Sequence, residues 1–415
     1  MPRPPRPAAF VLCCAALSTW MGVSTGCGGA DRPAMTDAEF QEAIADFDTA
    51  VRFELAGIYA GAVRGVEAEF ERVQAGEVDE AVVDVLMISS GGADGAFGAG
   101  FLQGWAEAED PAWRRPVFDR VTGVSAGALT APFAFVGTDE AYARIAEVFA
   151  NPQPDWASGS ALGSVLTDDE ALFNNDGLRT LIEDEIDDEM LAAIAEGQSQ
   201  GRALLVGATN LDLSRFRVFD LTQSARVGRE ELIEKALLAS ASIPGVFPPV
   251  EIDGWYYGDG GVVANLFLGV DRDLLWRREP GPWWDAEAGL PPVRIRHWVI
   301  VNGKVDPPPL TSAGQRIPRS WSSLGRRALS QMLVASNVRA LQQLDLESRF
   351  NQGRADIRHE FYWVCIPADA ELPEESGDLF DAAYMRALIE LGREMGKDPG
   401  SWRTESPRQV LSTGG

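Results

Sequence analysis

The sequence predicts an α/β domain in which a mostly parallel sheet is covered by helices on both faces. Continuously apolar stretches rich in β-branched residues are typical of strands buried on both sides of such a sheet. They occupy 82–90, 202–210, 296–303 and 360–367. Stretches with helical spacing alternate with them, at 97–107, 126–136, 140–150, 175–196, 229–240 and 324–350. Strands that alternate with helices in this way favour an α/β architecture.

Composition limits the kinds of partner that the protein can have. The chain has 415 residues, of which 46% are hydrophobic and 24% charged, as in an ordinary globular protein with a sizeable core. Its 62 acidic and 36 basic residues give a net charge of −26. Such an acidic surface repels nucleic-acid phosphates, so no nucleic-acid partner is expected. No feature of the sequence identifies a protein partner.

Residues 1–27 have the composition of a secretion signal. Arg3 and Arg6 precede a short apolar segment that ends in small residues. Its end, STGC, resembles the lipobox of bacterial lipoproteins, in which the cysteine, here Cys27, becomes lipid-modified. Ser24 stands where that motif usually has leucine, and an ordinary cleaved signal is the alternative. We expect export across the inner membrane and a lipid anchor at Cys27 in the bacterial cell envelope.

The remaining chain divides into three parts. Residues 28–81 form a polar tether followed by a helical segment, 82–370 form the main domain, and 371–415 form a C-terminal helix and tail. Two irregular inserts, at 271–295 and 303–322, have the length and composition of lids or binding loops.

Ser125 has the surroundings of a nucleophile. It lies in VTGVSAGALT, between Gly123 and Gly127, after a predicted strand at 118–122 and before the predicted helix at 126–136. A sharp strand-to-helix turn needs small residues two positions away on either side. The positive end of the following helix also favours negative charge developing at the hydroxyl.

A glycine-rich segment, SSGGADGAFGAGFL at 89–102, follows the first predicted strand. A dinucleotide-binding loop also has glycines at this place, but its fingerprint requires glycine where this chain has Phe97. The alternative is an oxyanion hole, in which the backbone N–H groups of Gly91 and Gly92 bind the oxygen of a tetrahedral intermediate.

Asp259 is the candidate base for Ser125. It lies in YYGDGG, at the end of a predicted strand, where the small neighbours allow another loop to approach. An Asp-Gly turn without catalytic function is the structural alternative. A buried carboxylate can accept the serine proton if the transfer is concerted with attack and the oxyanion is stabilised. Alternatively, one of the chain's two histidines, His297 or His359, completes a Ser–Asp–His triad.

These elements, in this order, resemble the patatin-like phospholipases. That family has a glycine-rich oxyanion loop, then a G-x-S-x-G turn, then a D-G-[GA] segment that carries the aspartate of a Ser–Asp dyad. The match places Gly91, Gly92 and Gly95 in the oxyanion loop, Ser125 as the nucleophile and Asp259 as its partner. The resemblance covers roughly 82–365 and includes VGATNLDL and ALLASASIPGVFPPVEIDGWYYGDGG.

The resemblance implies a three-layer α/β/α fold, preceded here by the N-terminal helical segment. It also implies a carboxylic ester hydrolase that acts on lipid or other acyl esters without a cofactor. No metal site is expected, because two isolated histidines and few cysteines cannot form a closed zinc site.

Two positions depart from the family pattern. Ser90 replaces the first glycine of the oxyanion loop, and Asp94 replaces a basic residue. In the family that basic residue favours the anionic phosphate of a phospholipid, which Asp94 would repel. Asp94 is therefore a candidate selectivity residue that favours neutral acyl esters. A surface lipoprotein that binds lipid without turnover, its site altered by Asp94, is a further alternative.

Overall fold

The structure is a computed structural model that describes residues 35–110, 113–158, 171–268, 292–306, 321–373 and 378–407. The signal segment with Cys27, and most of the two inserts, lie outside these ranges. Among the described residues, no helix combines the length and apolar character needed to cross a membrane.

One eight-stranded sheet runs through the described part of the domain, in the order β5-β6-β3-β2-β1-β7-β8, with β4 also paired to β3. The strands of the parallel part are β1 (Val82–Ile88), β2 (Arg120–Val124), β3 (Ala203–Asn210), β7 (Val293–Val301) and β8 (Ile357–Cys365). Antiparallel pairing adds β4 (Arg215–Asp220), β5 (Val250–Ile252) and β6 (Trp255–Asp259).

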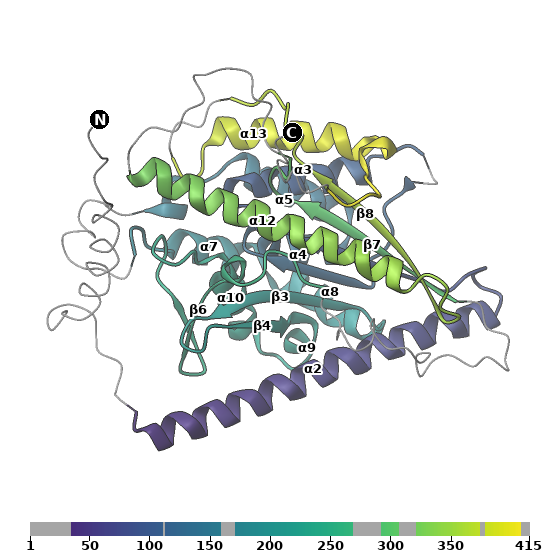
Figure 1. Ribbon diagram of the computed structural model, residues 1–415, viewed down its shortest axis with the longest axis horizontal. Coiled ribbons are helices and arrows are strands. Elements are labelled where there is room, and N and C mark those ends of the chain that lie inside the picture. The colour runs from purple at the N-terminus through teal and green to yellow at the C-terminus, as the bar shows by residue number, and fades with distance from the viewer. Residues whose placement is uncertain are drawn as a thin grey trace, which may run out of the picture.

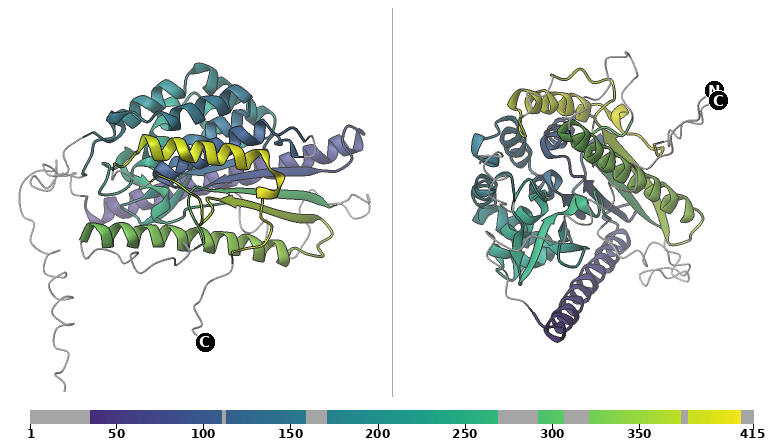
Figure 2. Two further views of the ribbon diagram at one scale, coloured as in Figure 1. Left: turned by 90° about the horizontal axis from the view of Figure 1, so that it is seen from above. Right: turned by 60° about the vertical axis from the view of Figure 1, so that its left-hand side comes forward.

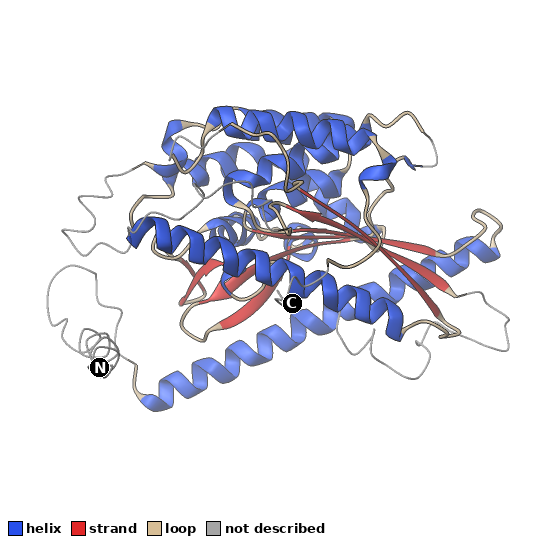
Figure 3. Cartoon of the chain, turned by 45° about the horizontal axis from the view of Figure 1, so that its top comes forward, coloured by secondary structure: helices blue, strands red, loops and turns tan. Residues whose placement is uncertain are grey.

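Helices cover both faces of this sheet (Figures 1, 2 and 3). On one side of the sheet lie α3 (Gly95–Ala106), α4 (Ala126–Val136), α5 (Asp139–Ala150), α7 (Asp176–Glu185), α8 (Asp188–Ser199), α9 (Leu221–Arg226), α10 (Glu230–Ala241) and α13 (Ala382–Lys397), which share one hydrophobic core. Of these, α5, α7 and α13 pack mainly on other helices of the layer. The other face packs against the C-terminal half of α2 (Asp37–Gln74) and against α12 (Trp321–Phe350). The predicted three-layer α/β/α fold with a preceding helical segment is confirmed.

β1 shows how the sequence produces this layering. Successive side chains of a strand point to opposite faces. Leu86 and Ile88 accordingly enter the core under α3 and α4, whereas Val85 and Met87 enter the core under α2 and α12. All four are buried, which is why the strand is apolar without alternation.

α13 packs directly on α3, the helix that follows the glycine-rich segment. Glycines on both helices allow the two backbones to touch: a Cβ atom at Gly100 or Gly104 would overlap the α13 backbone, and one at Gly392 or Gly396 would overlap the α3 backbone. Neither helix therefore tolerates a larger residue along this contact.

Two features of the fold differ from the sequence prediction. The helical stretch predicted at 175–196 forms two helices, because α7 ends at Glu185 and α8 begins at Asp188. The Asp187 carboxylate accepts a 2.9 Å hydrogen bond from the Met190 N–H and so caps α8. The antiparallel strands β4 and β5 were also absent from the prediction, whereas the strand predicted to end at Asp259 is β6.

Candidate active site

The strand register brings the ends of β2 and β6 together. β4 covers one edge of β3, so β2 and β6 share its other edge. Val124, the last residue of β2, pairs with Gly207, and Asp259, the last residue of β6, pairs with the next residue, Ala208. The two strands run in opposite directions and meet end to end. Ser125, which follows Val124, therefore lies beside Asp259.

Ser125 occupies a strained turn between β2 and α4. Its backbone angles, φ of 57° and ψ of −126°, lie in a region that residues other than glycine rarely adopt. Its backbone N–H donates a 2.9 Å hydrogen bond to the Ser240 hydroxyl, which in turn donates one of 2.7 Å to the Gly207 carbonyl oxygen. Ser240, from α10, thus holds the turn in place.

The glycines on either side of Ser125 are required by close backbone contacts. A Cβ atom at Gly123 would overlap the backbone of Gly127, and one at Gly127 would overlap the carbonyl oxygens at the end of β1. The Gly123 and Gly127 pattern therefore has the steric origin that the sequence suggested.

The Asp259 carboxyl group faces the Ser125 hydroxyl in a dry environment. Both side chains are about 95% buried, with 5% and 4% of their surface exposed. Burial raises the pKa of Asp259 from 3.8 to about 6, and hydrogen bonding with the Ser125 side chain and the Gly261 N–H opposes this rise. The Gly261 N–H donates to Asp259 Oδ1 at 2.7 Å.

The glycine-rich loop adjoins the Ser125 turn. Gly92, with φ of 56°, begins a short 3-10 turn, η1 (Gly92–Asp94), ahead of α3. A Cβ atom at Gly91 would overlap Asn302, and one at Gly95 would overlap the Ala126 side chain. Among the described residues, the N–H groups of Gly91, Gly92 and Ala126 have no hydrogen-bond acceptor, so they are available to bind an oxyanion.

Asp94 is held by the C-terminal helix. The Tyr384 hydroxyl on α13 donates a 2.7 Å hydrogen bond to Asp94 Oδ1. Asp94 Oδ2 lies 3.8 Å from where a Cβ atom of Gly303 would be. The acidic group thus lies at the α13 side of the glycine-rich loop.

Asn302 is a structural residue of the site that sequence reasoning missed. It follows β7, and its backbone N–H and side-chain amide donate 2.9 Å hydrogen bonds to the hydroxyl and carbonyl oxygens of Ser89. Its Oδ1 accepts a 3.0 Å bond from the Gly98 N–H of α3. One asparagine therefore joins the ends of β1 and β7 to the first turns of α3.

Both histidines of the chain lie far from Ser125. The rings of His297 on β7 and His359 on β8 are 5.2 Å apart between centroids, and burial lowers the pKa of both. His297 pairs with Val85, which pairs with Arg120 on β2. Ser125 is five residues beyond Arg120, roughly 16 Å along the strand. The Ser–Asp–His triad considered from the sequence is therefore not formed.

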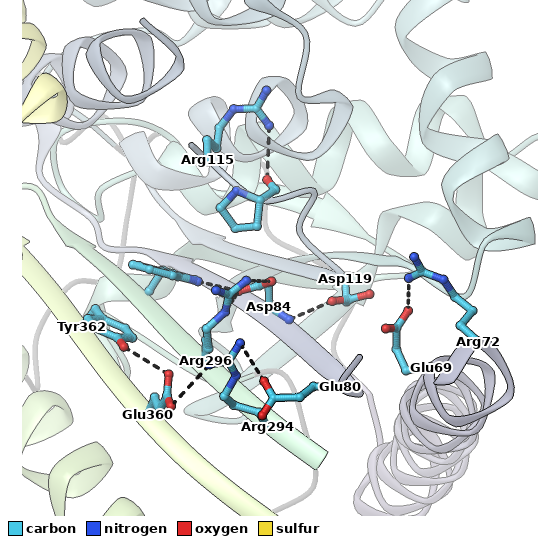
Figure 4. Close-up of polar contacts among 12 residues, drawn as sticks. Glu69, Arg72, Glu80, Asp84, Arg115, Asp119, Arg294, Arg296, Glu360 and Tyr362 are labelled. Atoms are coloured by element: carbon cyan, nitrogen blue, oxygen red, sulfur yellow. Dashed lines mark hydrogen bonds and ion pairs between the residues drawn. The ribbon is translucent and has the colours of Figure 1, made fainter. Parts of the chain in front are cut away.

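A separate polar cluster lies at the opposite, amino-terminal edge of the sheet (Figure 4). It borders a cleft of about 850 Å³. Arg296 makes 2.7 and 2.5 Å hydrogen bonds to Asp84, and Arg294 pairs with Glu80 at 3.1 Å. Burial raises the pKa of the nearby Asp119 to about 7, and the Asp84 N–H, which donates to it at 2.7 Å, opposes this. These ion pairs stabilise the strand starts and lie away from the Ser125 turn.

The fold and the Ser125 turn define an α/β protein in which a buried serine lies beside a buried carboxyl group. A family model described as patatin-like phospholipase matches residues 86–270, which contain Ser125 and Asp259. This match assigns residues 86–270 to a patatin-like phospholipase domain, and at the level of that family it supports a lipid acyl hydrolase.

Among solved structures, the chain is similar to VipD from Legionella pneumophila. The two share 14% identity over 79% of this chain and 68% of that chain, with a TM-score of 0.36. No curated protein matches the sequence.

Proposed function

We propose that the protein hydrolyses carboxylic esters of lipids with Ser125 as nucleophile and Asp259 as general base. The Ser125 oxygen bonds to the ester carbonyl carbon while its proton passes to Asp259, and the N–H groups of Gly91 and Gly92 bind the oxyanion. Collapse to the acyl-enzyme releases the alcohol, which takes the proton from Asp259. Water then attacks the acyl-enzyme, again giving its proton to Asp259, and that proton returns to Ser125 as the fatty acid leaves.

The observation that carries this proposal is the burial of Ser125 and Asp259 side by side, with neither histidine near them. A carboxylate is a weak base for an alcohol in water because its pKa is many units too low. Desolvation moves the Asp259 pKa upward to about 6, and free N–H donors next to the turn lower the energy of the oxyanion. Both effects favour concerted proton transfer.

Substitution of the two residues tests the dyad. Ser125→Ala and Asp259→Asn are expected to abolish hydrolysis of a short-chain acyl ester while circular dichroism and gel filtration stay unchanged. His297→Ala combined with His359→Ala is expected to leave turnover per folded molecule largely intact. An active Asp259→Asn enzyme, or an inactive double histidine variant that is folded, would contradict the dyad.

A covalent probe separates an enzyme from a protein that only binds lipid. A fluorophosphonate is expected to label the wild-type protein at Ser125, because the reaction needs an activated hydroxyl and an oxyanion hole. Ser125→Ala is expected to remain unlabelled. A folded wild-type protein that neither labels nor hydrolyses any ester would favour the non-catalytic lipid-binding alternative.

We further propose that the substrates are neutral acyl esters, such as glycerides or glycolipids, in preference to anionic phospholipids. The support is Asp94, a carboxylate in the oxyanion loop where the resemblance leads one to expect a cation. A negative charge there disfavours a phosphate near the scissile ester. A lipid panel assayed with residues 28–415, beside Ser125→Ala, tests this preference.

The membrane anchor stays a separate proposal, since residues 1–34 lie outside the described part of the chain. Lipid attachment at Cys27 would place the enzyme on an envelope membrane after export. Expression of the full chain in a bacterial host with radiolabelled fatty acid is expected to label the wild type and leave Cys27→Ala unlabelled and soluble. Equal labelling of both proteins would contradict attachment at Cys27.

A further inference from the structure

Three buried polar side chains connect the oxyanion loop to the loop that follows Asp259 and to α12. They are Ser90, Asn265 and Asn337, whose exposed fractions are 5%, 1% and 3%, respectively. Ser90 directly precedes Gly91 and Gly92, Asn265 lies six residues after Asp259, and Asn337 lies on α12.

Asn265 makes contacts in both directions. Its Oδ1 accepts a short hydrogen bond from the Ser90 hydroxyl, and its backbone carbonyl oxygen accepts one of 3.4 Å from the Ser90 N–H. Its Nδ2 donates a 2.8 Å hydrogen bond to Asn337 Oδ1. An asparagine amide offers an acceptor and a donor at once, and here each has a buried partner. Loss of either partner would leave a buried polar group unsatisfied.

The same side chain borders the Asp259 carboxylate. A Cβ atom at Gly261 would lie 2.9 Å from Asn265 Oδ1, 3.0 Å from Asp259 Oδ1 and 3.2 Å from Ser90 Oγ. Gly261 is therefore enclosed by these three groups, and its N–H is bonded to Asp259. A movement of Asn265 would displace the Ser90–Gly91–Gly92 segment relative to the Ser125 and Asp259 pair.

We propose that Asn265 is a positioning residue, which sets the oxyanion donors relative to the Ser125–Asp259 pair through its bonds to Ser90 and Asn337. This inference rests on the proposed function of the same site. Asn265 itself contacts no reacting atom. Its effect is geometric, and a displacement of about 1 Å at a catalytic site can cost on the order of 100-fold in rate.

The test compares Asn265→Ala and Ser90→Ala with the wild type, using a soluble acyl ester and a fluorophosphonate. Asn265→Ala is expected to lower kcat and the labelling rate by about 10- to 100-fold, with KM changed less than about threefold. Ser90→Ala is expected to give a smaller loss of the same kind. The double variant is expected to be no slower than Asn265→Ala, because both substitutions remove the same hydrogen bond between Ser90 and Asn265.

Asn351→Ala provides a matched control. Asn351 is also a buried asparagine, 2% exposed, and directly follows α12. Its side-chain amide donates a 2.8 Å hydrogen bond to the Glu347 carbonyl oxygen. This variant is expected to lose stability but to keep the wild-type kcat and labelling rate. An equal fall in kcat for Asn351→Ala and Asn265→Ala would overturn the positioning role.

Two further outcomes are decisive. Wild-type kcat and labelling in a folded Asn265→Ala protein would overturn the inference while leaving the dyad intact. If Asn265→Ala does not fold, Ser90→Ala decides, and wild-type kcat in that variant would overturn the inference equally. A wild-type protein without turnover or labelling would instead overturn the proposed function, and the inference with it, so the two failures are distinguishable.

Discussion

The hydroxyl of Tyr384 donates a 2.7 Å hydrogen bond to the carboxylate of Asp94, which connects the glycine-rich loop to α13. This contact connects the proposed selectivity residue to a residue 290 positions away in the sequence. It also gives the hydroxyl of Tyr384, which is buried at 8% exposure, a hydrogen-bond partner.

Reversal of this charge is expected to change the head-group preference. Asp94→Arg should raise the ratio of anionic phospholipid to neutral glyceride hydrolysis by roughly 10-fold, because a repulsive charge becomes an attractive one. The measurement is the ratio of kcat/KM for two lipids with the same acyl chain. Asp94→Asn, which removes the charge alone, should give an intermediate ratio. An unchanged ratio in both variants would exclude Asp94 from selectivity.

The activity is expected to fall in acid because Asp259 must be ionised to accept the serine proton. Its pKa is about 6, so kcat/KM for an uncharged soluble ester should be constant at higher pH and fall about tenfold per unit below pH 6. A pH profile measured between pH 4.5 and 8.5 checks this. A profile that stays flat to pH 4.5 would argue against Asp259 as the base.

Asp259→Asn is expected to stabilise the fold at neutral and alkaline pH. Burial raises the folded-state pKa of Asp259 from 3.8 to about 6, so the wild type loses stability as pH rises between these values. The loss amounts to up to about 3 kcal/mol above pH 6 and is absent below about pH 4. Urea unfolding of both proteins at pH 4 and pH 8 should show a gap only at pH 8. An equal gap at both values would contradict the buried-carboxylate explanation.

The strained backbone conformation of Ser125 is expected to destabilise the folded protein. With φ at 57°, Ser125→Gly should be more stable than Ser125→Ala by about 1 kcal/mol, and both should be inactive. Ser214, also at positive φ (52°) in the exposed turn before β4, is the matched control. Ser214→Gly should also be more stable than Ser214→Ala, but both variants should keep activity. Equal unfolding free energies of Ser125→Gly and Ser125→Ala would contradict the strain.

The elements predicted best are those with a strong local pattern. The apolar run of β1 is buried on both faces, and the helix predicted at 126–136 is α4. Gly123 and Gly127 were found because the steric rule that requires them acts within a few residues. The break between α7 and α8 was missed, although Asp187 has the side chain of an N-cap.

The missed residues of the site act through long-range contacts. Ser240, Asn265 and Asn302 bond to groups 115, 175 and 213 positions away, and each is a single polar residue without a periodic pattern. Likewise, the meeting of β2 and β6 depends on how both pair with β3, which no local pattern encodes. From its local sequence Asp259 was one candidate base for Ser125, with an Asp-Gly turn as the alternative, and the resemblance of the whole motif order favoured the pair.

The contact between the glycines of α3 and α13 joins two helices that are synthesised at different times during translation. α3 follows the glycine-rich loop near the start of the domain, but the helix that covers it begins at Ala382, after all the described strands. Until α13 has been synthesised, the surface of α3 that packs on it stays exposed. The hydrogen bond from Tyr384 to Asp94 cannot form either. The glycine-rich loop therefore reaches its final support only after α13 has been translated.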